Sequence, residues 1–213
     1  IKPIKKIKGF QDLKIKKEDI TGILPHIASI SPSGNLTSKE SNILNKVIGS
    51  YEKVNSDLDL DKDEFVLQGH EINEFKSIKT QDRARYLIYR YKYNKYPELK
   101  IVDDFPPCIQ IEPSSICNYR CIMCYQIDKS FSNKSNGYMG YMDLNLYKNI
   151  IDQIEGRVEA VTLASRGEPL LNKDFIKMLE YSSGKFLGFK INTNASLLSE
   201  KLSHAILSNL DVG

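Results

Sequence analysis

The sequence lacks a long apolar run, lacks a strong charge of either sign and lacks the spread of cysteines that is typical of a disulfide framework. No stretch of about 18 apolar residues occurs, and 30 basic residues are nearly balanced by 27 acidic ones, which leaves a formal charge of +3. These absences argue against a membrane-spanning protein and against binding to nucleic acid or an anionic membrane. Because no signal peptide precedes the first segment, the sequence favours a cytoplasmic protein.

Histidine and cysteine are also scarce, with three and four copies in 213 residues. The histidines stand singly, without a partner at ligand spacing. Three of the cysteines, however, fall within eight positions. In a cytoplasmic chain this clustering indicates metal or redox chemistry rather than disulfide pairing. The sequence begins without methionine and ends in a short apolar segment that is typical of another strand, so we expect a fragment of a longer protein.

Residues 1–104 are expected to form a separate, mostly helical region of unassigned role. Helices are predicted at about 38–54 and 81–95, the first of them after a capping box at Thr37-Ser38-Lys39-Glu40. The alternation of apolar and basic residues in Ile1–Lys8 is typical of an edge strand, although a disordered arm fits equally well.

The predicted helix at 81–95 carries a band of tyrosines interleaved with cations. Rings and cations so arranged could stack on the bases of a nucleic acid. We favour a helix that packs its rings against a neighbouring domain while its cations reach water. Nucleic acid is therefore not expected as a partner.

A short strand, Cys108–Glu112, is predicted after the two prolines at 106 and 107. It is followed by Cys117, Cys121 and Cys124 in the spacing C-x-x-x-C-x-x-C. Three thiolates on one short loop can ligate three irons of a four-iron four-sulfur cluster, which leaves the fourth iron open to a small molecule.

The rest of the sequence alternates strands and helices. Strands are predicted at 158–164 and 186–191, and amphipathic helices follow each of the three strands. This alternation favours an α/β fold with a parallel sheet and right-handed crossovers. Gly167-Glu168-Pro169 follows the second predicted strand, and Asn192-Thr193-Asn194 follows the third.

These motifs, in this order, resemble those of the radical S-adenosylmethionine (SAM) enzyme superfamily. Residues 105–213 are similar to the N-terminal half of its core domain, a (βα)6-type barrel of which about three βα units are present. The resemblance implies a 4Fe-4S cluster on Cys117, Cys121 and Cys124. It also implies contacts to SAM from Gly167, Glu168, Pro169, Asn194, Met123 and Tyr125.

The same resemblance implies reductive cleavage of SAM to a 5′-deoxyadenosyl radical, which abstracts hydrogen from a substrate. An electron donor such as flavodoxin or ferredoxin is implied, and the substrate could be a peptide, a sugar or another small molecule. No catalytic side chain is assigned beyond the cluster and the cofactor. Two positions depart from the family pattern. Met123 stands where an aromatic residue is common, and Ala195 stands where glycine allows a positive φ.

Two alternatives compete with this interpretation. The first is a zinc-stabilised binding module in which Cys108 or a histidine completes the three-cysteine set. Zinc prefers four converging ligands, and Cys108 lies at the far end of its strand from the loop. The second alternative is a noncatalytic relative of radical SAM enzymes whose barrel only binds a partner.

Overall fold

The computed structural model describes residue 20, residues 22–30 and residues 36–210. The chain divides into two compact units, Ile1–Ile101 and Val102–Gly213. The segment Ile1–Lys8, predicted as an edge strand or a disordered arm, lies outside the described residues.

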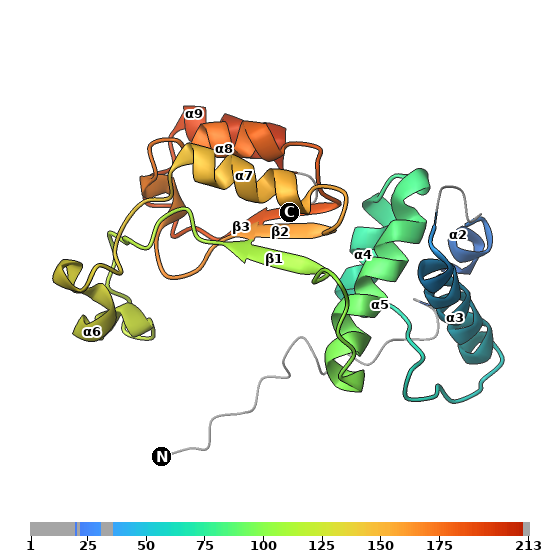
Figure 1. Ribbon diagram of the computed structural model, residues 1–213. Helices are drawn as coiled ribbons and strands as arrows, with labels where there is room; N and C mark the ends of the chain where they lie inside the picture. Colours follow the sequence, from blue (N-terminus) through green and yellow to red (C-terminus); the bar gives the residue numbers. More distant parts are fainter. Residues whose placement is uncertain (1–19, 21, 31–35, 211–213) are drawn as a thin grey trace, which may run out of the picture. The chain divides into compact units, whose positions relative to one another are not determined.

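The described part of the first unit is helical (Figure 1). Its helices are α2 (Leu24–Ala28), α3 (Ser38–Asn55), α4 (Gly69–Ser77) and α5 (Arg83–Leu99), and a 3-10 turn at Thr80–Asp82 precedes α5. The predicted capping box is present at the start of α3, where Thr37 Oγ1 accepts a hydrogen bond from the Glu40 backbone and the Glu40 carboxylate accepts one from the Thr37 backbone. The helices enclose a core that includes Leu44, Val47, Tyr51, Leu67, Phe75 and Leu87.

The tyrosine band of α5 packs inside the first unit, so the prediction of a neighbouring domain as its packing partner was wrong. The ring of Tyr86 lies 6.1 Å from that of Phe75, and the ring of Tyr91 lies 6.3 Å from that of Phe65. Of the tyrosines on α5, Tyr93 is the exposed one. Because the buried rings already have partners, they are not available to stack on the bases of a nucleic acid.

Glu71 of α4 and Arg90 of α5 form a buried ion pair beneath these rings. The Glu71 carboxylate accepts hydrogen bonds from Arg90 Nε at 2.8 Å, Asn94 Nδ2 at 3.1 Å and the Gln68 backbone at 2.6 Å. Burial opposes the charge on Arg90, but the neighbouring carboxylate raises the pKa of the guanidinium above its usual value. The pair ties α4 to α5 and satisfies polar groups that have left water.

The second unit is built on a three-stranded parallel sheet, which confirms the α/β prediction. The strands are β1 (Cys108–Ile111), β2 (Ala160–Leu163) and β3 (Gly188–Ile191), in the order β1-β2-β3. Each observed strand is shorter than its predicted span. The register is regular, since Ile111 pairs with Leu163 and Leu163 pairs with Ile191.

Helices α7 (Leu144–Ile154), α8 (Phe175–Ser182) and α9 (Glu200–Asn209) lie on the same side of this sheet in Figure 1. The main core of the unit lies between α7, α8 and the strands, and its fully buried members include Tyr147, Ile151, Met178, Val161, Leu163 and Phe189. The shorter elements are η3 (Tyr125–Ile127), α6 (Lys129–Ser132), η4 (Lys134–Asn136) and η5 (Pro169–Leu171). Within residues 20, 22–30 and 36–210, no helix combines the length and apolar character needed to cross a membrane.

Candidate functional site

The motif residues lie on three loops that leave the carboxyl ends of the strands. The cysteine loop follows β1, Gly167-Glu168-Pro169 follows β2, and Asn192-Thr193-Asn194 follows β3. Because the strands are parallel and in register, the three loops begin side by side at one edge of the sheet. This edge is where open α/β sheets bind their ligands.

The cysteine loop is closed at its base by backbone and side-chain hydrogen bonds. The Ser115 backbone N donates to the Gly140 carbonyl at 3.0 Å, and the Gly140 backbone N donates to Ser115 Oγ at 2.8 Å. Gln126, which is 2% exposed, donates from Nε2 to the Ser115 carbonyl at 2.8 Å. These bonds hold the cysteine segment between fixed ends.

Gln126 also carries a buried oxygen without a protein partner. Its Oε1 makes no hydrogen bond with the described residues, and it lies two positions after Cys124. A buried acceptor left unpaired is unfavourable, so this oxygen is suited to a donor that the protein itself does not supply. No sequence signal singles out this residue, because a lone glutamine between Tyr125 and Ile127 belongs to no motif.

Gly167 allows the loop after β2 to approach the start of the cysteine loop. A Cβ atom at this position would lie 1.8 Å from the Ser114 carbonyl oxygen and 2.8 Å from that of Ile116. The neighbouring Glu168 backbone N donates to the same Ile116 carbonyl at 2.9 Å. The first residue of the Gly-Glu-Pro motif is therefore glycine because two backbones meet here.

The Glu168 carboxylate joins the loop after β2 to the turn after β3. Glu168 is 2% exposed. Its Oε1 accepts hydrogen bonds from Thr193 Oγ1 at 2.6 Å and the Leu170 backbone at 3.0 Å, and its Oε2 accepts one from the Asn194 backbone at 2.7 Å. An ionised carboxylate has roughly four acceptor positions, so one on Oε2 is left for a further donor.

Asn194 contacts both Glu168, through its backbone, and Cys117, through its side chain. Its side-chain Nδ2 lies 3.8 Å from Cys117 Sγ and donates to Asn118 Oδ1 at 3.0 Å. The backbone N of Tyr119 donates to the same sulfur at 3.4 Å. The structure therefore brings Cys117, Glu168 and Asn194, which come from three different loops, into one connected group.

The other two cysteines are not assembled with Cys117. Within the described residues, no three side chains of the His, Cys, Asp or Glu type form a group that could hold a metal ion. Cys121 is exposed, and so are Met123 at 84% and Tyr125 at 48%. The Cys124 backbone N donates to the Cys121 carbonyl at 2.9 Å, as in a turn.

The donor set nevertheless fits an iron-sulfur cluster. Cys117, Cys121 and Cys124 are free thiols, which are the ligands that such clusters use. Residues 117–124 contain no helix or strand, so closure of the loop around a cluster breaks no contact in the sheet. The close approach at Gly167 and the unpaired oxygen of Gln126 lie beside this loop.

Arg166 is held in an ion pair at the same edge of the sheet. Its backbone N donates to Glu112 Oε1 at 2.7 Å, and its Nη2 donates to Glu112 Oε2 at 2.8 Å. Ser165, which precedes it, has a φ of 149°, a value rare outside glycine, and its side chain also bonds to Glu112. This pairing links the ends of β1 and β2.

The ion pair predicts a dependence of stability on pH. Burial pushes the pKa of Glu112 upward, but hydrogen bonds from Arg166 outweigh it and hold this pKa below the usual 4.5. The stabilising effect is therefore present above about pH 4.5 and is lost as the pH falls through the lowered pKa. We expect Glu112→Gln to lower the free energy of unfolding at pH 7 by about 1 kcal/mol and the deficit to shrink below about pH 4. Urea denaturation followed by circular dichroism measures this, and a deficit that does not vary with pH would contradict it.

Ala195 adopts the strained conformation that the sequence suggested. Its φ is 60°, in the left-handed region that costs a residue with a Cβ roughly 1 kcal/mol. We expect Ala195→Gly to raise the free energy of unfolding by up to about 1 kcal/mol. The same change at Ala205, inside α9, is expected to lower it by about 1 kcal/mol. Equal effects at the two positions in thermal unfolding would rule out relief of strain at Ala195.

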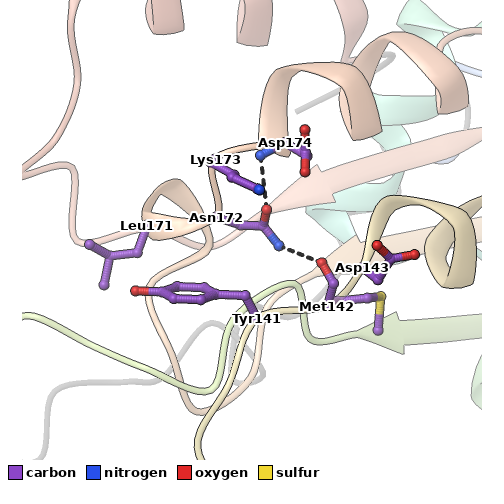
Figure 2. Close-up of a pocket in the computed structure, with 7 residues that line it drawn as sticks. All are labelled: Tyr141, Met142, Asp143, Leu171, Asn172, Lys173 and Asp174. Atoms are coloured by element: carbon purple, nitrogen blue, oxygen red, sulfur yellow. Dashed lines mark hydrogen bonds between the residues drawn. The ribbon is translucent and has the colours of Figure 1, made fainter.

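An open pocket of about 410 Å³, which none of these motif residues lines, lies between the segments that precede α7 and α8. It is lined by residues 141–143 and 171–174, as Figure 2 shows. Asn172 spans it, because its Nδ2 donates to the Met142 carbonyl at 3.0 Å and its Oδ1 accepts from the Asp174 backbone at 2.9 Å. The bond from Nδ2 joins the two segments, whereas the bond to Oδ1 lies within the segment before α8.

The second unit is thus an α/β domain whose parallel sheet carries a cysteine loop, a glycine-glutamate turn and an asparagine turn at its carboxyl edge. Residues 111–212 match the family model described as "Radical SAM superfamily". This part of the chain, slightly less than half of it, is therefore similar to the radical SAM superfamily. No solved structure matches the chain.

Curated relatives also match a part of the chain. "Mycofactocin maturase MftC" of Mycobacterium tuberculosis (strain CDC 1551 / Oshkosh) is 25% identical over 100 residues, which are 47% of this chain and 24% of that protein. "S-adenosylmethionine-dependent nucleotide dehydratase" of Selenomonas ruminantium is 32% identical over 84 residues, which are 38% of this chain and 27% of that protein. The chain thus spans about a quarter of the length of the curated relatives it matches.

Proposed function

We propose that the chain is part of a radical SAM enzyme, in which Cys117, Cys121 and Cys124 ligate a 4Fe-4S cluster and SAM binds beside them. The observation that carries this proposal is the connection of Cys117, Glu168 and Asn194 at one edge of the sheet, inside the segment that matches the family. When bound, the cluster and SAM supply the reductive radical chemistry that no side chain can perform. On this proposal the protein is an oxidoreductase that removes hydrogen from its substrate.

The protein's own residues would bind and orient the cofactor. Glu168 has an acceptor position left for the amino group of SAM, where a charge-assisted hydrogen bond is favourable. Gly167 and Pro169 set the backbone that presents this carboxylate. Met123 and Tyr125 are exposed apolar side chains on the cysteine loop, suited to packing against the adenine and excluding water.

The finer architecture is also part of the proposal. Residues 105–213 would form the first half of a (βα)6-type barrel. Further strands of a longer protein would pair with β3 on the side that does not face β2. Residues 1–104 would be a separate region without an assigned role. We place the protein in the cytoplasm, with flavodoxin or ferredoxin as electron donor and without a nucleic-acid partner.

The substrate is proposed only as a class. One relative is named for the maturation of mycofactocin and another for the dehydration of a nucleotide, so the names do not agree on a substrate. We propose a peptide, a sugar or another small molecule. Fold alone does not choose among them.

A zinc-stabilised module is disfavoured by the position of Cys108. This residue begins β1 and the cysteine loop follows the other end of that strand, so Cys108 and the loop lie at opposite edges of the sheet. Zinc requires four ligands that converge on one point.

Formation of 5′-deoxyadenosine tests the proposal against a noncatalytic relative. The complete protein that contains these residues is reconstituted anaerobically with iron and sulfide and then mixed with SAM and dithionite. We expect 5′-deoxyadenosine by chromatography, its loss in Cys121→Ala, and its retention in Cys108→Ala, which removes a cysteine outside the motif. Absence of the product from a protein that carries the cluster would favour a barrel that only binds a partner.

A further inference from the structure

Three polar side chains from two loops form a closed ring of hydrogen bonds beside Cys117. Asn194 Nδ2 donates to Asn118 Oδ1 at 3.0 Å, Asn118 Nδ2 donates to Ser196 Oγ at 2.8 Å, and Ser196 Oγ donates to Asn194 Oδ1 at 2.6 Å. Asn118 lies between the first two cysteines, whereas Asn194 and Ser196 lie 76 and 78 positions away in the chain. The ring therefore fixes the start of the cysteine loop to the turn after β3.

A backbone N–H determines which atom of each side chain in the ring donates and which accepts. The Ser196 backbone N, which can only donate, lies 2.9 Å from Asn194 Oδ1. This makes Oδ1 the acceptor and turns Nδ2 of Asn194 toward the cysteine loop. Each member then donates to the next, so the bonds reinforce one another.

The ring leaves one N–H donor of Asn194 facing the sulfur of Cys117, at 3.8 Å from nitrogen to sulfur. The Asn194 backbone is itself held by Glu168 at 2.7 Å, so the amide is fixed at both ends. With the Tyr119 backbone at 3.4 Å, Cys117 Sγ has two donors. A sulfur that ligates iron becomes more negative when the cluster is reduced, and donors aimed at it stabilise the reduced state.

We propose that Asn118, Asn194 and Ser196 are positioning residues that hold an N–H donor against Cys117 and thereby raise the reduction potential of the cluster. This inference rests on the proposed function only for the presence of the cluster. The hydrogen-bonded ring consists of protein side chains only, so it can be tested in the chain without a cluster. Its effect on the potential is tested in the chain with a cluster.

The first experiment uses the chain without a cluster and follows the side-chain amide resonances of asparagine by NMR. The Asn194 signal is assigned by its loss in Asn194→Ala. We expect it to shift in Ser196→Ala and in Cys117→Ala, to return in Ser196→Thr, which restores a hydroxyl, and to stay in place in Asn192→Ala on the same turn. A signal that Ser196→Ala leaves unchanged would overturn the ring, and a signal that Cys117→Ala leaves unchanged would overturn the contact between Asn194 and Cys117.

The second experiment measures the reduction potential of the reconstituted cluster, without SAM, by a titration followed by electron paramagnetic resonance. We expect Asn194→Ala to shift the potential to a more negative value, Asn118→Ala to shift it in the same direction, and Ser196→Thr and Asn192→Ala to keep the original value. Equal potentials in the unaltered chain and in Asn194→Ala would overturn the proposed effect on the cluster. If the unaltered chain assembles no cluster, the proposed function and the effect on potential both fail, whereas the NMR result still decides the ring.

Discussion

Replacing Gly167 with alanine is expected to disrupt the edge of the sheet where the three motif loops meet. The new Cβ would lie 1.8 Å from the carbonyl oxygen of Ser114 and 2.5 Å from its carbonyl carbon. Both are backbone atoms next to a buried strand end, so neither can move aside as a flexible side chain would. Overpacking of a core costs about 1–3 kcal/mol, and we expect Gly167→Ala to reach or exceed the upper end of this range. Urea denaturation followed by circular dichroism measures the loss.

Gly140→Ala is the matched control for this prediction. Gly140 also lies at the base of the cysteine loop, but a Cβ there would meet no atom within 4 Å. We expect its free energy of unfolding to stay within about 0.5 kcal/mol of the unaltered chain. If Gly167→Ala is as stable as Gly140→Ala, the close approach of the two loops is not a feature of the protein in solution.

Removal of the Glu71 carboxylate is expected to destabilise the first unit by about 3–5 kcal/mol, because it leaves a buried guanidinium without its counter-charge. The side chain of Arg90 is 9% exposed and that of Glu71 is 1% exposed. Glu71→Ala also removes the acceptor for Asn94 Nδ2 and for the Gln68 backbone at the start of α4. The measurement is the urea midpoint by circular dichroism, together with hydrogen exchange of the amides in α4 and α5.

Two further variants distinguish the effect of breaking the buried Glu71–Arg90 ion pair from the effect of removing any one negative charge. Glu98 is 48% exposed in its ion pair with Lys95 on the same helix, and Glu98→Ala is expected to change stability by less than about 1 kcal/mol. The double variant Glu71→Met/Arg90→Met removes both buried charges and is expected to recover much of the stability. If Glu71→Ala is as stable as Glu98→Ala, the prediction is wrong, because Arg90 is then solvated or bonded to another group in the variant.

The local features of the fold could be predicted from the sequence. The capping box at Thr37 and the three strands follow from signals within a few residues of one another, and the parallel sheet follows from the alternation of strands and helices. Local signals of this kind depend on neighbouring residues in the chain, which the sequence displays directly. The positive φ at Ala195 was expected instead from the resemblance to the family, whose pattern has glycine at this position.

The contacts that assemble the site could not be predicted, because they join residues far apart in the chain. Asn118 bonds to Ser196 across 78 positions, and Arg166 bonds to Glu112 across 54. Spacing alone did not indicate that the Glu168 carboxylate would bind Thr193. The steric reason for glycine at 167 also appears only when the loop after β2 meets the segment before the cysteines.

The most direct test of the central claim is the metal content of the chain after anaerobic reconstitution. The chain is incubated with iron, sulfide and a thiol reductant, separated from free ions, and analysed for iron, sulfide and zinc, with its visible absorption recorded. We expect about four irons and as many sulfides for each chain, together with a broad charge-transfer band. We expect both to be lost in Cys117→Ala, Cys121→Ala and Cys124→Ala but not in Cys108→Ala. One tightly bound zinc for each chain, or iron that is retained when the motif cysteines are removed, would contradict it.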